Sequence, residues 1–162
     1  MKTQTSKEKR KALVGIDVVA VAEHYINDKD HTIAKSFIDR IKPGEFETYT
    51  THALLALVEN WKAKEIREKV LEIYHSYYYV IPAMEIEERS KENKIVFEEV
   101  VGKLSKIDVK EEDGALAVVA SLFNLSLVTL NRKHLRNKRE EINEILKEVR
   151  LSEIEILLPN EI

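Results

Sequence analysis

The sequence has 162 residues, with 26 lysines and arginines against 29 aspartates and glutamates, so its formal net charge at pH 7 is -3. A chain of this length can bury roughly 70% of its unfolded surface, which is enough for one soluble domain without a covalent staple. It contains no cysteine, which excludes a disulfide scaffold, a zinc ribbon and a thiol nucleophile. Only four glycines and three prolines are present, which argues against a turn-dense sandwich and a glycine-rich phosphate loop. We therefore expect helices to dominate.

The N-terminal segment is basic and leads into an apolar run. Residues 2–11 are rich in lysine, and residues 12–22 read ALVGIDVVAVA. Asp17 divides this run into two short stretches, neither of which could serve as the apolar core of a signal peptide, and no other segment approaches the ~18 apolar residues of a membrane span. We predict a flexible basic leader over residues 1–11, a single domain over residues 12–162, a cytoplasmic location and no membrane contact.

Short apolar runs alternate with longer amphipathic segments along the chain. The runs that favour β-strands cover residues 12–16, 45–51, 77–81, 125–130 and 154–158. The segments that favour helices cover residues 18–26, 31–41, 52–61, 62–74, 84–104, a buried helix from residue 111, and 132–149. Strands separated by helices of this length are typical of right-handed βαβ units, so the sequence predicts an α/β fold with a mainly parallel sheet flanked by helices.

Four polar residues stand next to these predicted strands and helices. Asp17 follows the first strand, Glu59 lies in the otherwise apolar helix after the second, and Asp113 begins the buried helix before the fourth strand, which ends at Asn131. Sites in parallel sheets lie beyond the carboxyl ends of the strands, where these side chains can converge. Clustered carboxylates repel one another unless a cation neutralises them, and oxygen ligands suit Mg²⁺ or Mn²⁺.

Each of the four residues also has a structural explanation. Asp17 could cap the helix that follows it, and Asp113 could complement the dipole of its own helix. Glu59 could be a rim residue, and Asn131 is a residue type favoured in turns. The four together are more informative than any one of them, because an acid that interrupts an apolar run is costly without compensation.

The sequence resembles the PIN domain, the fold of metal-dependent ribonucleases that includes VapC-type toxins. The resemblance spans residues 12–162 and is carried by ALVGIDVVAVAEHY, THALLALVENW, DGALAVVASLFNLSLVTLNRKHL and the ending LPNEI. It implies a three-layer fold in which Asp17, Glu59 and Asp113 hold Mg²⁺ or Mn²⁺ and Asn131 assists catalysis. Val18 and Val19 depart from the family pattern, which places a Thr or Ser and then an Asn at these positions to orient the acid and its water.

A basic stretch follows Asn131 directly. Its members expected to bind the substrate are Arg132, Lys133, His134 and Arg136. Next to the predicted metal ion they could seat an RNA backbone, although they could equally be solvated helix positions balanced by the glutamates that follow them.

Two functions therefore stay open. The first is a metal-dependent endoribonuclease that hydrolyses RNA phosphodiester bonds and could be the toxin of a toxin–antitoxin pair. Its expected partners are RNA, a small antitoxin protein and a second copy of the chain. The second is a PIN-fold binding or assembly module with weak or no catalysis. Retention of the three acids favours the first function, whereas Val18 and Val19 favour the second.

Overall fold

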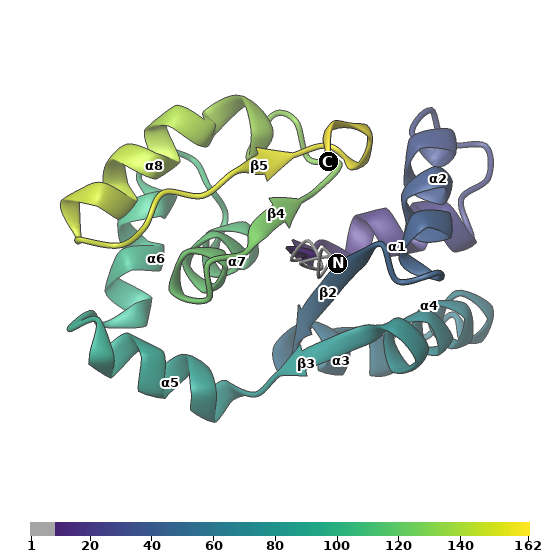
Figure 1. The fold of residues 1–162 in the computed structure, drawn as a ribbon, viewed down its shortest axis with the longest axis horizontal. Helices are drawn as coiled ribbons and strands as arrows, with labels where there is room; N and C mark the ends of the chain where they lie inside the picture. The colour runs from purple at the N-terminus through teal and green to yellow at the C-terminus, as the bar shows by residue number, and fades with distance from the viewer. Residues whose placement is uncertain (1–8) are drawn as a thin grey trace, which may run out of the picture.

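A computed structural model describes residues 9–162, and it consists of one parallel sheet flanked by helices (Figure 1). The strands are β1 (Arg10–Val14), β2 (Phe46–Thr51), β3 (Tyr78–Ile81), β4 (Ser126–Val128) and β5 (Ile156–Leu157). The α-helices are α1 (Ile16–Glu23), α2 (His31–Ile41), α3 (His52–Glu59), α4 (Lys64–Tyr77), α5 (Ala83–Glu92), α6 (Phe97–Ser105), α7 (Glu111–Leu122) and α8 (Arg139–Glu148). Two short 3-10 helices complete the fold, η1 (Arg136–Lys138) and η2 (Pro159–Glu161).

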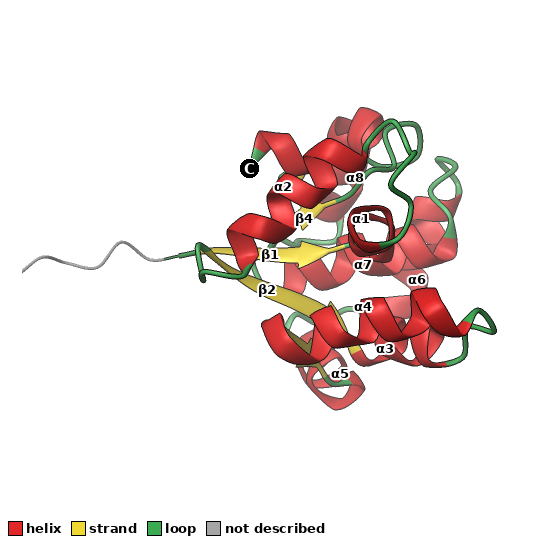
Figure 2. Ribbon diagram, turned by 90° about the vertical axis from the view of Figure 1, so that its right-hand side faces the viewer, coloured by secondary structure: helices red, strands yellow, loops and turns green. Residues whose placement is uncertain are grey.

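The five strands lie in the order β3-β2-β1-β4-β5, and every neighbouring pair is parallel. This confirms the predicted α/β class and parallel sheet. All strands therefore end at the same edge, which Figure 2 shows as the side toward which the β1 arrow points and where α1 begins.

The core is divided by the sheet into two clusters. Leu13 of β1 packs with α6, α7 and α8, whereas its neighbours Ala12 and Val14 pack with α1, α2 and α4 on the other face. This alternation follows from the two-residue period of a strand, and it explains why β1 is apolar at consecutive positions. Within residues 9–162, none of the helices combines the length and apolarity needed to cross a lipid bilayer.

Three predicted segments differ from the structure. Residues 1–8 of the predicted leader lie outside the described residues, but Arg10 and Lys11 already pair with β2 and so belong to the sheet. The predicted helix over residues 84–104 is two helices, because the chain turns at Lys94, whose φ of 56° lies in the left-handed region. The predicted helix over residues 132–149 begins only at residue 139, after a turn and η1.

Candidate functional site

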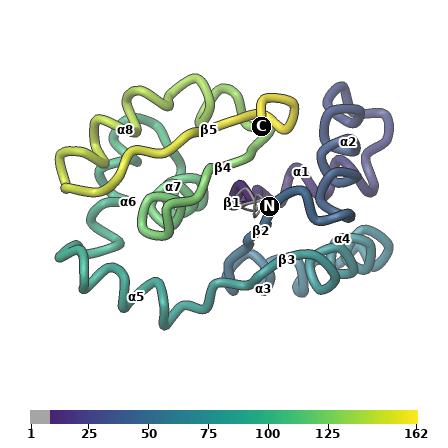
Figure 3. Tube along the Cα trace, in the orientation of Figure 1, coloured from purple at the N-terminus to yellow at the C-terminus, as the bar shows by residue number. Residues whose placement is uncertain are grey.

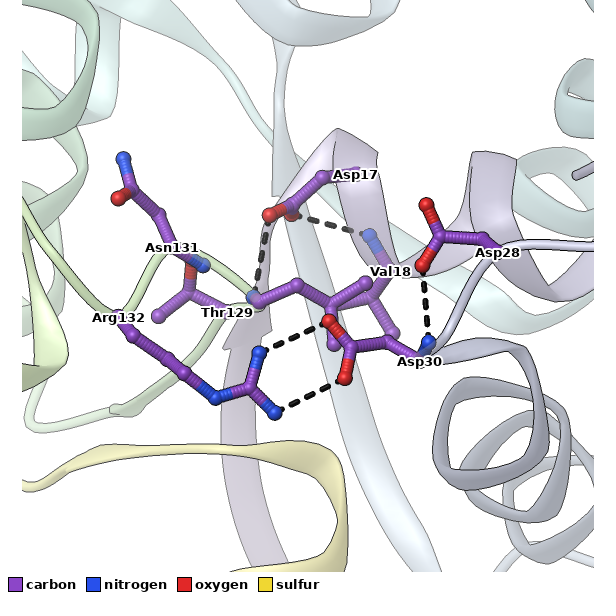
Figure 4. A network of polar contacts seen from close by, with 8 residues as sticks. Asp17, Val18, Asp28, Asp30, Thr129, Asn131 and Arg132 are labelled. Carbon is purple, nitrogen blue, oxygen red and sulfur yellow. Dashed lines mark hydrogen bonds and ion pairs between the residues drawn. The ribbon is translucent and has the colours of Figure 1, made fainter.

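Asp17 lies in the first turn of α1 rather than at the end of β1, and its carboxylate is held by backbone on both sides. Oδ1 accepts a hydrogen bond from the Val18 N–H at 3.0 Å, and Oδ2 accepts one from the Leu130 N–H at 3.0 Å (Figure 4). Burial raises the pKa of Asp17, these two N–H donors lower it, and the negative charge of Asp113 raises it further. The Asp17 carboxylate therefore joins the start of α1 to the loop after β4, within electrostatic reach of a second acid.

Asp113 lies in the first turn of α7 and is positioned by Asn131. The Asn131 amide Nδ2 donates to Asp113 Oδ2 at 3.0 Å, and Asn131 Oδ1 in turn accepts the backbone N–H of His134 at 3.1 Å. Burial and the neighbouring Glu112 raise the pKa of Asp113, whereas His134 and the Asn131 hydrogen bond lower it. The structure thus brings together Asp113 and Asn131, which lie 18 residues apart in sequence.

Glu59 does not join these acids. It is the last residue of α3 and is exposed to solvent. Because α3 begins at the sheet edge, seven further residues at 1.5 Å each carry Glu59 about 10 Å along the helix axis from that start. Among residues 9–162, no three His, Asp or Glu side chains are grouped in a way that could hold a metal ion. The expectation that Asp17, Glu59 and Asp113 share a cation is therefore not met at Glu59.

The basic stretch after Asn131 is partly neutralised by acids from elsewhere in the chain. Arg132 forms a two-pronged ion pair with the buried Asp30 at the start of α2, at 2.8 and 2.9 Å (Figure 4). Arg136 forms a similar pair with Glu161 of η2, whose Nε to Oε1 distance is 2.7 Å. Of the predicted substrate-binding residues, Lys133 is exposed and forms no ion pair within residues 9–162. The pairing of the two arginines gives them a structural role, which the sequence did not predict.

Arg132→Ala is expected to lower the free energy of unfolding by about 2 kcal/mol, because it leaves the Asp30 carboxylate, only 8% exposed, without its charged donors. Asp30→Asn should cost less, about 1 kcal/mol, since the Arg132 side chain is 37% exposed and can be hydrated. Thermal and urea unfolding would measure both changes, with the exposed Lys133→Ala as the matched control. Equal losses in Arg132→Ala and Lys133→Ala would contradict this.

The Arg132 hydrogen bonds hold the pKa of Asp30 below its ordinary value. A lowered carboxylate pKa means that the stabilisation is complete above the unfolded pKa and is lost as the pH falls through the folded one. The difference in the free energy of unfolding between the wild type and Arg132→Ala should therefore decrease below about pH 4.

The two remaining acids suit a hard divalent cation. Each Asp17 oxygen accepts one N–H, and Asp113 Oδ1 has no hydrogen-bond partner within the described part of the chain, so both carboxylates keep free lone pairs. Mg²⁺ is commonly held by one or two carboxylates with water completing its octahedron. The oxygen donors of Asp17 and Asp113 are therefore of the kind that Mg²⁺ or Mn²⁺ prefers, and among residues 9–162 they are not part of a group of three acids.

Gly15 gives the Asp17 carboxylate the space it occupies. A Cβ at Gly15 would lie 2.5 Å from Asp17 Oδ1, closer than real Cβ contacts come. Gly15→Ala should displace the carboxylate and, in the metal site proposed below, weaken Mn²⁺ binding about tenfold, in the range found when groups that orient a ligand are lost. Gly102→Ala in α6 is the control, because its Cβ would meet nothing within 4 Å. Calorimetric titration with Mn²⁺ would test this, and an unchanged affinity in Gly15→Ala would count against it.

The parallel sheet order, the helices on both faces and the acids at the carboxyl edge together define a PIN-like α/β fold. A solved structure, VapBC2 from Rickettsia felis bound to a DNA fragment from their promoter, is similar over 91% of this chain and 98% of that chain, with a TM-score of 0.56 and 16% sequence identity. This similarity establishes the fold of the chain, as the sequence resemblance implied. No protein-family model and no curated protein sequence matches it.

Proposed function

We propose that the protein is a Mg²⁺- or Mn²⁺-dependent endoribonuclease that hydrolyses RNA phosphodiester bonds. The observation that supports this best is that Asp17 and Asp113 lie at one edge of the sheet, where burial raises the pKa of Asp17 most and the negative charge of Asp113 raises it further. Within residues 9–162 neither acid forms an ion pair, so burying their charges is costly, and a divalent cation would reduce that cost.

The residues of the site have distinct roles in this proposal. When bound, the ion would lower the pKa of water and stabilise negative charge on the phosphate oxygens. Asp17 and Asp113 would hold it, and the backbone N–H groups of Val18 and Leu130 keep the Asp17 carboxylate in one orientation. Asn131 does the same for Asp113 through its amide.

We assign RNA contact to the side chains of this edge that are not tied to acids by close ion pairs. Lys133 is exposed, and His134 lies beside Asn131 with its Nδ1 3.8 Å from the exposed Asp108 carboxylate. Arg132 and Arg136 would stabilise the structure of this edge rather than bind phosphate, because their guanidinium groups are already paired with Asp30 and Glu161. The resulting RNA affinity should depend on salt less steeply than four free cations would give.

Cleavage of single-stranded RNA by the purified protein tests the proposal. Cleavage with Mg²⁺ or Mn²⁺ that disappears in EDTA supports it, whereas equal cleavage with and without EDTA overturns it. Binding of Mn²⁺ without cleavage would support the cation site and contradict the proposed nuclease activity.

A non-catalytic PIN-fold module is the second candidate, and two observations favour it. Val18 and Val19 are fully buried, so they bring no polar group to Asp17 from the positions where the family pattern has them. Glu59 is exposed and supplies no third carboxylate. This candidate predicts that no Mn²⁺ binding depends on Asp17, so calorimetric titrations of the wild type and of Asp17→Asn with Mn²⁺ should give the same result.

The assembly partners are also part of the proposal. We also propose a small antitoxin protein and a second copy of the chain as partners, and a cytoplasmic location. The similarity to VapBC2 supports the first of these. Light scattering on the purified chain would test the homodimer, and co-expression with a candidate antitoxin would test whether cleavage is suppressed.

A further inference from the structure

A large apolar groove lies between α3, α5, the start of α6 and α7, and it reaches the first turn of α7 at Glu111 and Glu112. It has a volume of about 900 Å³, and its walls include Leu54 and Leu57 of α3, Ile86 of α5, Phe97 of α6 and Leu116 of α7. In Figure 3, α5 runs from the end of β3 along the edge of the molecule to α6. Neither Asp17 nor Asp113 lines it.

The groove and its border expose apolar side chains that a helical protein normally covers. Leu57 is 41% exposed and Val96, in the loop between α5 and α6, is 52% exposed. Met84 on the first turn of α5 is 71% exposed. Contiguous apolar surface of this kind, bordered by charged residues, is typical of an interaction site.

The charges around the groove are strongly acidic. Glu87 is paired with Lys91 at 3.4 Å, which accounts for the cation among the lining residues. Glu98, Glu111 and Glu112 also line the groove, and within residues 9–162 none of them forms an ion pair. A ligand that fills the apolar floor must therefore face three unpaired glutamates at its rim.

We propose that this groove binds a basic amphipathic helix of a partner protein. Apolar side chains spaced one helical turn apart would fill the floor, and lysines or arginines on the flanks would meet Glu98, Glu111 and Glu112. RNA fits poorly, because its phosphates would meet the same glutamates. A second copy of this chain fits poorly as well, because a two-fold contact places the same patch on both sides and so brings acid against acid. The inference does not depend on nuclease activity or on metal binding.

A designed peptide tests the proposal with the full chain. The probe is a fluorescent 18-residue amphipathic helix with leucine on one face and lysine on the other, and the control peptide carries glutamate in place of each lysine. We expect the lysine peptide to bind at least about tenfold more tightly than the control, with an affinity that falls as salt rises. Fluorescence anisotropy measures both.

Charge and apolar variants locate the binding surface. The triple change Glu98→Lys, Glu111→Lys and Glu112→Lys should weaken binding of the lysine peptide at least about tenfold, and so should Leu57→Asp. The matched controls are the triple change Glu140→Lys, Glu141→Lys and Glu144→Lys on exposed positions of α8, and Ile26→Asp, which is 67% exposed outside the groove. Thermal unfolding verifies that each variant folds.

Four results would overturn the proposal. The first is a lysine peptide that does not bind, and the second is a glutamate peptide that binds equally well. The third is self-association of the chain that Leu57→Asp abolishes, which would make a second copy the occupant. The fourth is displacement of the peptide by single-stranded RNA, if that RNA binds the wild type but not Leu57→Asp. This result would assign the groove to RNA. Loss of binding in both groove variants, with both controls unchanged, supports it.

Discussion

Asp113→Asn is expected to lower metal-dependent RNA cleavage by about a thousandfold or more while the protein stays folded. The substitution removes one of the two carboxylates that we propose as ligands of the ion, and loss of transition-state stabilisation of about 4 kcal/mol corresponds to a thousandfold in rate. The amide oxygen of asparagine can still accept the hydrogen bond from Asn131, so the local structure has no reason to change. Initial cleavage rates with Mn²⁺, measured beside circular dichroism, would give both quantities.

Two further variants make this experiment decisive. Glu140→Gln, an exposed acid on α8, controls for the loss of one negative charge. Glu59→Gln separates the two-carboxylate site from a three-carboxylate one, because exposure at the end of α3 predicts less than a tenfold effect. A loss of activity in Glu59→Gln as large as that in Asp113→Asn would show that Glu59 reaches the ion.

The fold could be predicted because the strands are apolar runs set between amphipathic helices. Leu13 and its neighbours are buried on both faces of the sheet, so β1 appears in the sequence as an uninterrupted apolar run. The helix from residue 111 could be found for the same reason, since α7 is buried along most of its length. The start of α8 could not, because the carbonyl of Asn131 accepts the N–H groups of Leu135 and Arg136 and forms a turn where the composition favours a helix.

The site could be predicted only where topology alone determines position. Asp113 and Asn131 meet because α7 begins and β4 ends at the same edge of the sheet. The partners of the two arginines could not be foreseen: Asp30 is 102 residues from Arg132, and Glu161 is 25 residues from Arg136. Such ion pairs depend on the packing of η2 and α2 against the sheet, for which local sequence carries no signal. The basic stretch therefore appeared more available to RNA than it is.

Metal binding at the proposed site should change the stability of the folded protein. At 100 times the dissociation constant, Mn²⁺ should stabilise the wild type by about 2.7 kcal/mol, which corresponds to roughly 5–10 °C in melting temperature for a chain of this size. Asp113→Asn should show no such shift. In EDTA at pH 7 the order should reverse, with Asp113→Asn at least as stable as the wild type, because burial and Glu112 disfavour the ionised Asp113 carboxylate.

The difference in stability between the metal-free wild type and Asp113→Asn should depend on pH with a definite sign. Because the pKa of Asp113 is raised in the folded state, the folded protein binds more protons than the unfolded chain between the ordinary and the raised pKa. The metal-free wild type should therefore gain stability relative to Asp113→Asn as the pH falls from 7 through the raised pKa, opposite to the effect of Asp30. Melting curves of both proteins in EDTA, from about pH 7.5 down to about pH 3.9, the ordinary pKa of an aspartate, measure this. A stability gap that stays constant across that range would show that folding does not disfavour the ionised Asp113 carboxylate. Equal stabilisation of both proteins by Mn²⁺ would show that Asp113 is not a metal ligand.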